Sequence, residues 1–455
     1  MLPIPSRWLR WLAAVLRYRL PNTATEPFCP AEVSGTIAVP SGASAWQKFR
    51  AYAGTGLLIS IGYIDPGNWA TDIEAGSRFG YGLLSVLLIS SLIAMLLQSV
   101  CVRVGVAAGA DLATLCRLHL RPRLNLGLWL LAEVAIVACD LAEVLGTSLA
   151  FRLLLGVPLT VGILLTALDT LVVLALQGRG VRRLEAIILV FLATVAIVYG
   201  IELYLARPDM VAVLRGFVPD LALLRDRRAW YLAVGILGAT VMPHNLYLHT
   251  ALMQTRATGG SAQERREAIR FSTWDTVIAL CLAFFINAAI LTLAGAAFHF
   301  TGHHEVADIQ DAHELLQPIL GTQMAAILFA VALLAAGQSS TLTGTLAGQI
   351  IMEGFLNLRI PCWQRRFITR ALAILPAWLG IIWLGEGALG RLLVLSQVTL
   401  SLQLPFAVIP LLCFAGNPKI MRGMPIGPWL RGMCWAACAL IIAANGWFVL
   451  QLAGS

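Results

Sequence analysis

Long apolar stretches recur along this sequence between residues 50 and 452. A helix needs about 20 apolar residues to cross the hydrocarbon core of a bilayer. The windows of that kind are 50–77, 80–106, 125–151, 158–177, 183–205, 230–256, 272–299, 322–354, 367–384, 389–414 and 428–452. Only 12% of the residues are charged, against about 25% in soluble domains, so the bilayer is the main solvent. The sequence therefore predicts an all-α polytopic membrane protein with eleven transmembrane helices.

The basic residues predict how these helices are oriented. Arg and Lys gather in the connections that follow the second, fourth, sixth, eighth and tenth windows, and one mixed connection, 206–229, is the exception. The main basic residues are Arg117, Arg121, Arg123, Arg179, Arg182, Arg183, Arg265, Arg266, Arg270, Arg365, Arg366, Arg370, Lys419, Arg422 and Arg431. Because cytoplasmic loops carry the excess of Lys and Arg, the N-terminus is expected inside and the C-terminus outside. The net charge of +8 therefore reflects the orientation of the helices in the membrane, and no nucleic-acid partner is expected.

The chain divides into five parts on this basis. Residues 1–47 form a cytoplasmic N-terminal tail, in which Arg alternates with Trp and Leu in an amphipathic segment, and residues 21–47 are expected to be flexible. Helices 1–5 occupy 48–205, and an extracellular connection spans 206–229. Helices 6–10 occupy 230–414, and the eleventh helix and C-terminus occupy 415–455. The nine Cys include no CxxC pair and are interpreted as small core residues.

Two of the windows contain a helix breaker beside polar groups near the middle of the membrane. These are IDPGNWA at residues 64–70 and MPHN at residues 242–245. They fall in the first and sixth helices, so each lies in the first helix of a set of five. Because five is an odd number, the second set of helices crosses the membrane in the opposite orientation to the first. Non-helical backbone at this depth is tolerated where it lines a cavity. The pattern predicts an inverted-repeat transporter whose substrate site lies between two broken helices.

The two breaks supply a particular set of ligand atoms. Asp65 has a carboxylate, Asn68 an amide oxygen and Met242 a thioether sulfur. Unwound carbonyls near Gly62 and Ala239 are expected to complete the shell. Oxygen with sulfur suits Mn²⁺ or Fe²⁺, whereas Mg²⁺ and Ca²⁺ prefer oxygen alone.

The third window carries three carboxylates on one helical face. Glu133, Asp140 and Glu143 are separated by seven and three residues, which brings them to the same side of a helix. Intramembrane carboxylates in a row are commonly proton relays. Ion pairs that tie this helix to Arg370 or another base are the alternative, and the two roles are compatible.

Histidines occur near the second break and in an acidic connection. His244 and His249 have side chains that titrate near neutral pH. They lie about 140° apart around a helix, so they do not form a two-histidine metal face. His244 is assigned to proton handling, and His249 is either a second relay group or a satisfied polar residue. His303, His304 and His313 are interpreted as solvated loop residues.

Three segments resemble the signature segments of the NRAMP family of proton-coupled manganese transporters: DPGNWATDIEAGSRFGYGLL, GATVMPHNLYLHTAL and AAGQSSTLTGTLAGQIIMEGFL. LSQVTLSLQLPFAVIPLL resembles the tenth helix of that family, and the likeness extends from about residue 30 to the C-terminus. The resemblance implies a LeuT-like fold and import of a divalent metal ion with protons by alternating access. It also implies residence in the bacterial inner membrane.

The same resemblance implies roles for individual residues. Metal ligands would be Asp65, Asn68, Met242, the carbonyls near Gly62 and Ala239, and Gln397. Gln403 is close enough in pattern to compete with Gln397 for the last place. By the same resemblance the proton pathway would comprise His244, Asp140, Glu133 and Glu143, with Arg370 preferred over Arg365 and Arg366 as the basic partner. Asp65, where metal and proton compete, and His249, the candidate second relay group, are added to this pathway from their positions beside the breaks.

Other functions fit the sequence less well. A sodium-coupled amino-acid symporter of the same fold would need amides and small residues for its substrate, and a transporter that prefers Mg²⁺ would not need Met242. No nucleophile–base set or nucleotide-binding loop indicates an enzyme. The expected partners are a divalent metal ion such as Mn²⁺, Fe²⁺ or Cd²⁺, protons and lipid, with no resident cofactor and no obligate protein partner.

Overall fold

A computed structural model of the 455-residue chain describes residues 35, 37–39, 44–167, 181–220, 222–257, 261–304, 306, 308–320, 323–357 and 362–453. The amphipathic segment predicted within residues 1–20 lies outside this range. Residues 21–47 were expected to be flexible, but part of them is ordered. Ile37–Ala38 (β1) pairs in parallel with Arg256–Ala257 (β2). The chain before the first predicted helix therefore lies beside the segment that follows the sixth predicted helix.

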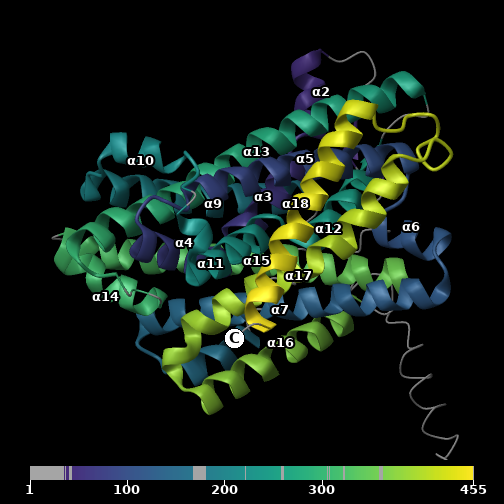
Figure 1. The fold of residues 1–455 in the computed structure, drawn as a ribbon. Helices are drawn as coiled ribbons and strands as arrows, with labels where there is room; N and C mark the ends of the chain where they lie inside the picture. Colours follow the sequence, from purple (N-terminus) through teal and green to yellow (C-terminus); the bar gives the residue numbers. More distant parts are fainter. Residues whose placement is uncertain are drawn as a thin grey trace, which may run out of the picture.

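Long helices fill most of the predicted windows and run side by side (Figure 1). They are α5 (Leu84–Ala108), α7 (Pro122–Leu155), α9 (Val181–Ala206), α13 (Ala262–Ala297), α15 (Gln323–Leu356), α16 (Cys362–Leu384), α17 (Leu389–Ala415) and α18 (Pro428–Ala453).

Six helices in the described part of the chain are long and apolar enough to cross a membrane. A seventh candidate is the pair Pro122–Leu155 and Leu159–Ala167, which is bent by 117°. Their surfaces carry many exposed apolar side chains, including Leu92, Phe285 and Trp447, as expected where lipid is the solvent. The chain is therefore a multi-pass membrane protein.

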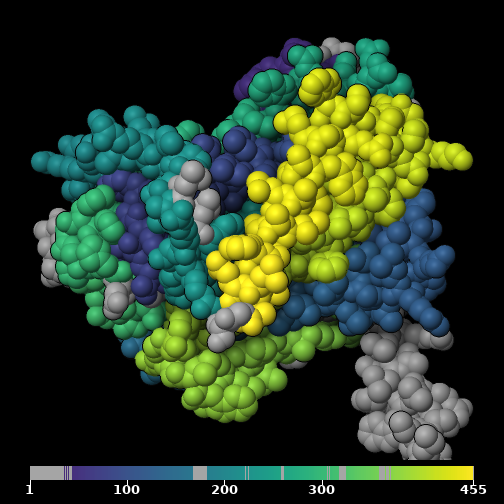
Figure 2. All heavy atoms as spheres, viewed as in Figure 1, coloured from purple at the N-terminus to yellow at the C-terminus, as the bar shows by residue number. Residues whose placement is uncertain are grey.

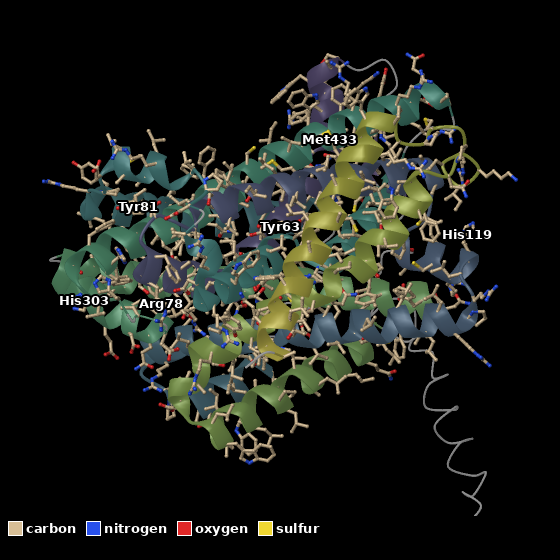
Figure 3. All side chains as sticks on the ribbon, viewed as in Figure 1. Tyr63, Arg78, Tyr81, His119, His303 and Met433 are labelled. Atoms are coloured by element: carbon tan, nitrogen blue, oxygen red, sulfur yellow. The ribbon has the colours of Figure 1, made fainter. Side chains whose placement is uncertain are left out.

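Shorter helices connect the long ones: α2 (Ala45–Tyr52), α6 (Leu112–His119), α10 (Met210–Gly216) and α14 (Ile309–Leu320). Polar side chains start several of them, since Ser44 and Gln47 form a capping box on α2 and Asp111 caps α6. His119 and His303 lie at opposite ends of the molecule, and Tyr63 lies between them in the middle (Figure 3).

Two of the predicted windows are broken as expected. The first contains α3 (Thr55–Ser60), the 3₁₀ turn η1 (Ile61–Ile64) and α4 (Pro66–Phe79), with Asp65 extended between the last two. The second contains α11 (Arg227–Thr240) and α12 (Pro243–Leu252), with Val241 and Met242 non-helical between them. A proline at the first helical position has no N–H to leave unpaired, so each proline starts a new helix after the break.

The broken helices lie inside a layer of unbroken ones. α4 packs against α13, α11 against α17, and α7 against both α15 and α17. α18 contacts α17 and α11 from the outside and runs diagonally across the face seen in Figure 2. The two breaks therefore lie in the interior, where side chains rather than lipid surround them.

Candidate metal centre

Asp65 marks the end of the first break. Its backbone is extended, its side chain is fully buried, and its Oδ1 accepts the backbone N–H of Asn68 at 3.0 Å. Aspartate is a preferred N-cap, and a helix N-terminus stabilises negative charge. The helix that follows the break thus holds the carboxylate in place without a basic side chain.

Asn68 connects the two breaks directly. Its Nδ2 donates to Asp65 Oδ1 at 2.6 Å and to the carbonyl oxygen of Ala239 at 3.0 Å. Ala239 lies in the last turn of α11, just before the second break. Both donor positions of the amide are used in this way, which leaves the amide oxygen for another partner. Three of the predicted ligands therefore meet in one buried group.

Met242 and Gly62 come together through a residue that the sequence analysis did not assign. The Nδ2 of Asn245 donates to Met242 Sδ at 3.6 Å, and a Cβ atom built on Gly62 would lie 2.6 Å from the same nitrogen. Met242 is completely buried. A signal was present, because Asn245 follows Pro243 by the same two residues that separate Asn68 from Pro66.

Gln397 of α17 also reaches this group. Its Nε2 donates to Asp65 Oδ2 at 3.4 Å, and Gly67 leaves it room, since a Cβ at residue 67 would overlap the Gln397 amide. Gln403 is buried elsewhere on α17, and its side-chain amide has no hydrogen-bond partner among the described residues. The structure thus brings Gln397 rather than Gln403 to Asp65.

The predicted carboxylates of the third window lie on α7. Asp140 and Glu143 are buried, and Gly344 of α15 gives them space, because a Cβ there would lie 2.6 Å from Glu143 Oε1 and 3.3 Å from Asp140 Oδ1. Arg370 of α16 lies with Nη1 3.7 Å from Glu143 Oε2. Glu133 is half-buried, and its Oε1 accepts from Trp129 at 2.8 Å. Asp140 and Glu143 thus lie on the same side of α7, and the ion pair with Arg370 that was the alternative is present as well.

A cysteine links these carboxylates to the second break. The Sγ atom of Cys139 lies 3.5 Å from His244 Nε2 and donates to Glu143 Oε1 at 3.6 Å. Cys139 also packs in one buried cluster with Met242. The cysteines were predicted to be packing residues, and nothing in the local sequence distinguishes Cys139 from the others.

His249 belongs to a different set of contacts. Its Nδ1 lies 2.8 Å from Gln98 Oε1, and its Nε2 lies 3.4 Å from the hydroxyl of Thr276. The amide of Gln98 in turn donates to the Tyr63 hydroxyl at 2.8 Å. His249 therefore faces α5 and α13, whereas His244 faces α7.

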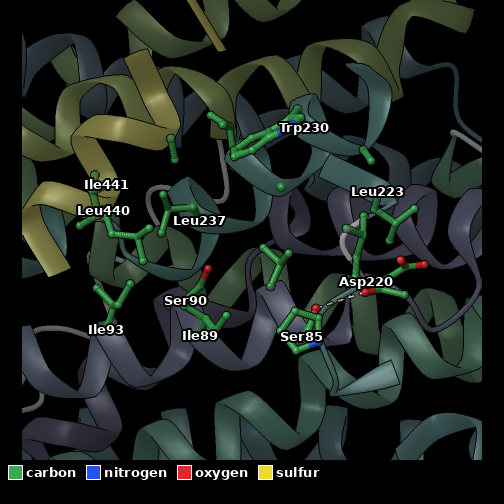
Figure 4. Close-up of a pocket in the computed structure, with 18 residues that line it drawn as sticks. Ser85, Ile89, Ser90, Ile93, Asp220, Leu223, Trp230, Leu237, Leu440 and Ile441 are labelled. Atoms are coloured by element: carbon green, nitrogen blue, oxygen red, sulfur yellow. Dashed lines mark hydrogen bonds between the residues drawn. The ribbon is translucent and has the colours of Figure 1, made fainter. Parts of the chain in front are cut away.

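An apolar cavity of about 200 Å³ lies apart from this centre, between α5, α11 and α18 (Figure 4). Ile89, Trp230, Leu237 and Leu440 are among its walls, and among the described residues Asp220 is the only charged one in its lining. None of the predicted metal ligands lines it. Its chemistry suits an apolar molecule rather than an ion.

The fold and the buried centre define a class: membrane transporters that bind substrate where two broken helices meet. The chain belongs to the Nramp family, since the family described as "Natural resistance-associated macrophage protein-like" matches residues 56–451. This confirms the resemblance found in the sequence.

Relatives cover nearly all of the chain. "Divalent metal cation transporter MntH 1" of Pseudomonas aeruginosa is 57% identical over 430 residues, which cover 94% of this chain and 98% of that protein. "Divalent metal cation transporter MntH" of Ralstonia nicotianae is 56% identical over 433 residues, or 95% of this chain and 98% of that protein.

Solved structures agree with this assignment. The Eremococcus coleocola manganese transporter in complex with an aromatic bis-isothiourea substituted compound has a TM-score of 0.84 and 36% identity, and the match covers 91% of this chain and 89% of that chain. The nucleobase-cation-symport-1 family transporter Mhp1 matches with a TM-score of 0.59 at 15% identity, over 88% of this chain and 93% of that one. The second likeness shows the shared LeuT-like fold alone.

Proposed function

We propose that this chain is a secondary active transporter that imports a divalent transition-metal ion together with protons by alternating access. Mn²⁺ is the preferred ion, and Fe²⁺ and Cd²⁺ are also carried. Relatives named as divalent metal cation transporters and a structural neighbour named as a manganese transporter support this function. The donor atoms gathered at the breaks support the choice of ion.

The observation that carries the proposal is the contact of Asn68 with both Asp65 and Ala239. One amide holds a carboxylate from the first break against a carbonyl from the second, in a fully buried position. The sulfur of Met242 is buried at the second break, where it accepts from Asn245 at 3.6 Å. An ion that binds there as substrate would receive hard oxygens and a soft sulfur, which favours Mn²⁺ and Fe²⁺ over Mg²⁺ and Ca²⁺.

Protons would follow the groups on α7 and α12. In this scheme a dication beside Asp65 competes with the proton for the carboxylate, which couples the two ions electrostatically. The displaced proton passes by way of His244 to Asp140 and Glu143, with Arg370 as the charge partner and Glu133 nearer the end of the route. The short contacts of Cys139 with His244 and Glu143 support this order. His249 would be a secondary relay group.

The proposal includes the predicted topology. Eleven helices would span the bacterial inner membrane, with the N-terminus inside, the C-terminus outside and five-helix repeats at 48–205 and 230–414. The matching breaks at Asp65 and Met242 support the repeat, since each lies in the first helix of its half. The pieces of the two broken helices, α3, α4, α11 and α12, are each too short to cross the membrane alone. They are therefore not among the six helices in the described part of the chain that are long and apolar enough to do so.

Metal uptake into proteoliposomes, with a pH dye inside, tests this function. Wild-type protein should accumulate Mn²⁺ and acidify the lumen in step, and Asp65→Ala should abolish both. Asp209→Ala is the matched control, because Asp209 also caps a helix, α10, but is exposed. Near-normal Mn²⁺ uptake by Asp65→Ala would refute the site. Preference for Mg²⁺, or a sodium-dependent current with an amino acid, would replace the proposed function with one of its alternatives.

A further inference from the structure

A second group of acidic side chains is buried away from the candidate metal centre. Asp72 of α4 and Glu202 of α9 are both 0% exposed, and Tyr199 of α9 is 1% exposed. α4 and α9 lie next to each other in Figure 1, and the rings of Trp69 and Tyr199 meet edge to face at 4.9 Å between centroids. The two helices therefore bring three ionisable groups into one buried region, which we call the outer acid cluster.

The polar atoms of the outer acid cluster lack partners. Both carboxylate oxygens of Asp72, both of Glu202 and the hydroxyl of Tyr199 have no hydrogen bond within the described part of the chain. Both carboxyl groups lie within electrostatic range of the Tyr199 phenol. Buried polar groups in folded proteins are almost always hydrogen-bonded, so five unpartnered atoms in one place call for an explanation.

The surroundings offer no compensating positive charge. Asp65, on the same helix as Asp72, is also acidic and interacts with it electrostatically. α15 contributes the ring of Phe329, 5.3 Å from Trp69, and α14 contributes His313, which lies against Phe329. α13 meets α4 through Leu291, Ala294 and Gly295. Among the described residues no Lys or Arg interacts with either carboxyl group.

The nearby carboxylate of Glu74 shows the contrast. Glu74 is 1% exposed on the same helix, but it pairs with Arg78 at 3.0 Å and with Arg228 of α11. Its charge is therefore compensated. An unpaired ionised carboxylate in a dry interior is destabilised by several kcal/mol, so a group such as Asp72 takes up a proton instead.

We propose that the outer acid cluster is a proton-binding site, in which Asp72 and Glu202 each bind a proton while α4 and α9 are packed together. Each carboxylate gains one proton and becomes a neutral carboxylic acid, with no other bond made or broken. Tyr199 lies within electrostatic range of both acids, and its hydroxyl makes no hydrogen bond to either of them in the described part of the chain. Separation of α4 from α9 would expose the acids to water and release the protons.

The proton-binding site is distinct from the route on α7. Asp140 and Glu143 have Arg370 as a charge partner, whereas the outer acid cluster has no basic group, so its protons bind without competition from a cation of the protein. It is also separate from the metal ligands, since Asp72 lies one helical turn beyond Asn68 and Glu202 is on another helix. The proposal stands whichever ion the protein carries.

Infrared spectroscopy tests the proposal on the purified full-length protein. Neutral carboxyl groups give a C=O stretching band that ionised carboxylates lack, and this band shifts in heavy water. Asp72→Asn and Glu202→Gln should each remove part of the band at neutral pH, and the double variant should remove both parts. Glu74→Gln is the matched control and should leave the band unchanged, because Glu74 pairs with Arg78 and Arg228.

A proton count provides the second measurement. Titration between alkaline and acidic pH should show about one bound proton fewer for each acid replaced, and Asp72→Glu should restore the lost proton. Unchanged Mn²⁺ binding by each variant shows that it is folded. If neither variant reduces the infrared band or the proton count while Mn²⁺ binding persists, Asp72 and Glu202 are ionised and the proposal is wrong. Loss of uptake in a variant whose band is reduced as expected would concern the transport function and would support the proton-binding site.

Discussion

Replacing Asn68 with alanine tests whether one amide organises the metal centre. The backbone N–H of residue 68 would still donate to Asp65 Oδ1 at 3.0 Å, so Asp65 should still cap α4. Only the side-chain bonds to Asp65 Oδ1 at 2.6 Å and to the Ala239 carbonyl at 3.0 Å would be lost. The change thus separates the organisation of the ligands from the folding of the helix.

The size of the effect follows from these two bonds. Because the nitrogen of Asn68 makes them, they persist when the amide oxygen faces an ion, and they orient Asp65 and Ala239 before the ion arrives. Loss of an orienting partner of a metal ligand typically weakens binding about 10–100-fold, which is about 1.4–2.8 kcal/mol. Loss of the amide oxygen as a ligand adds to this, so the figure is a lower bound.

Isothermal titration of the purified protein with Mn²⁺ measures the change. Thr71→Val is the control, because the Thr71 hydroxyl donates to the backbone carbonyl of Asn68 at 2.9 Å and is buried on the same helix. The control should bind Mn²⁺ like the wild type. If Asn68→Ala binds Mn²⁺ within about threefold of the wild type, the bridge between the breaks has no role in binding.

Three further predictions concern selectivity, coupling and stability. Met242→Ala should allow Ca²⁺ and Mg²⁺ to compete far better with Mn²⁺ in uptake, and unchanged selectivity would refute the role of the sulfur. Asp140→Asn should reduce luminal acidification more than Mn²⁺ binding, and the reverse result would exchange the roles of Asp140 and the metal ligands. Asp308, in the connection before α14, accepts the N–H of Gly390 at 2.6 Å, and burial raises its pKa to about 6. The folded state therefore keeps this proton to higher pH than the unfolded chain, so the resulting stability is present below the ordinary value of 3.8 and is lost as the pH rises through 6. Thermal unfolding of Asp308→Asn should lack this dependence, and identical pH profiles for both proteins would contradict it.

The breaks were predictable because their chemistry is local. A proline with polar neighbours inside an apolar window has few structural solutions in a membrane, and both DPGN and MPHN form breaks that start a new helix. The face shared by Asp140 and Glu143 was also predictable, since it needs only the helical period. The family assignment rested on the same segments and is confirmed by the matched region.

Contacts between distant segments were not predictable from the sequence. Cys139 lies beside His244, and Asn245 beside Gly62, only because α7 and the two breaks pack together. Asp72 and Glu202 are 130 positions apart, and their common neighbour Tyr199 carries no motif. The β pairing of Ile37–Ala38 was missed for the same reason, since nothing in residues 21–47 indicates a partner near residue 256.

In the proposed mechanism, the second break joins the metal site to the proton route. Met242 and His244 are two residues apart at the start of α12; Cys139 belongs to the same buried cluster as Met242, and its Sγ lies 3.5 Å from His244 Nε2. Cys139 also donates to Glu143, whose other oxygen lies 3.7 Å from Arg370. Met242 is the N-cap of α12 and His244 is its second residue, so we expect a movement of this helix start to shift the sulfur and the imidazole together. In the proposed mechanism, a displacement of α12 that opens or closes the metal centre would also change the contact of His244 with Cys139, and we expect the two ions to be coupled in this way.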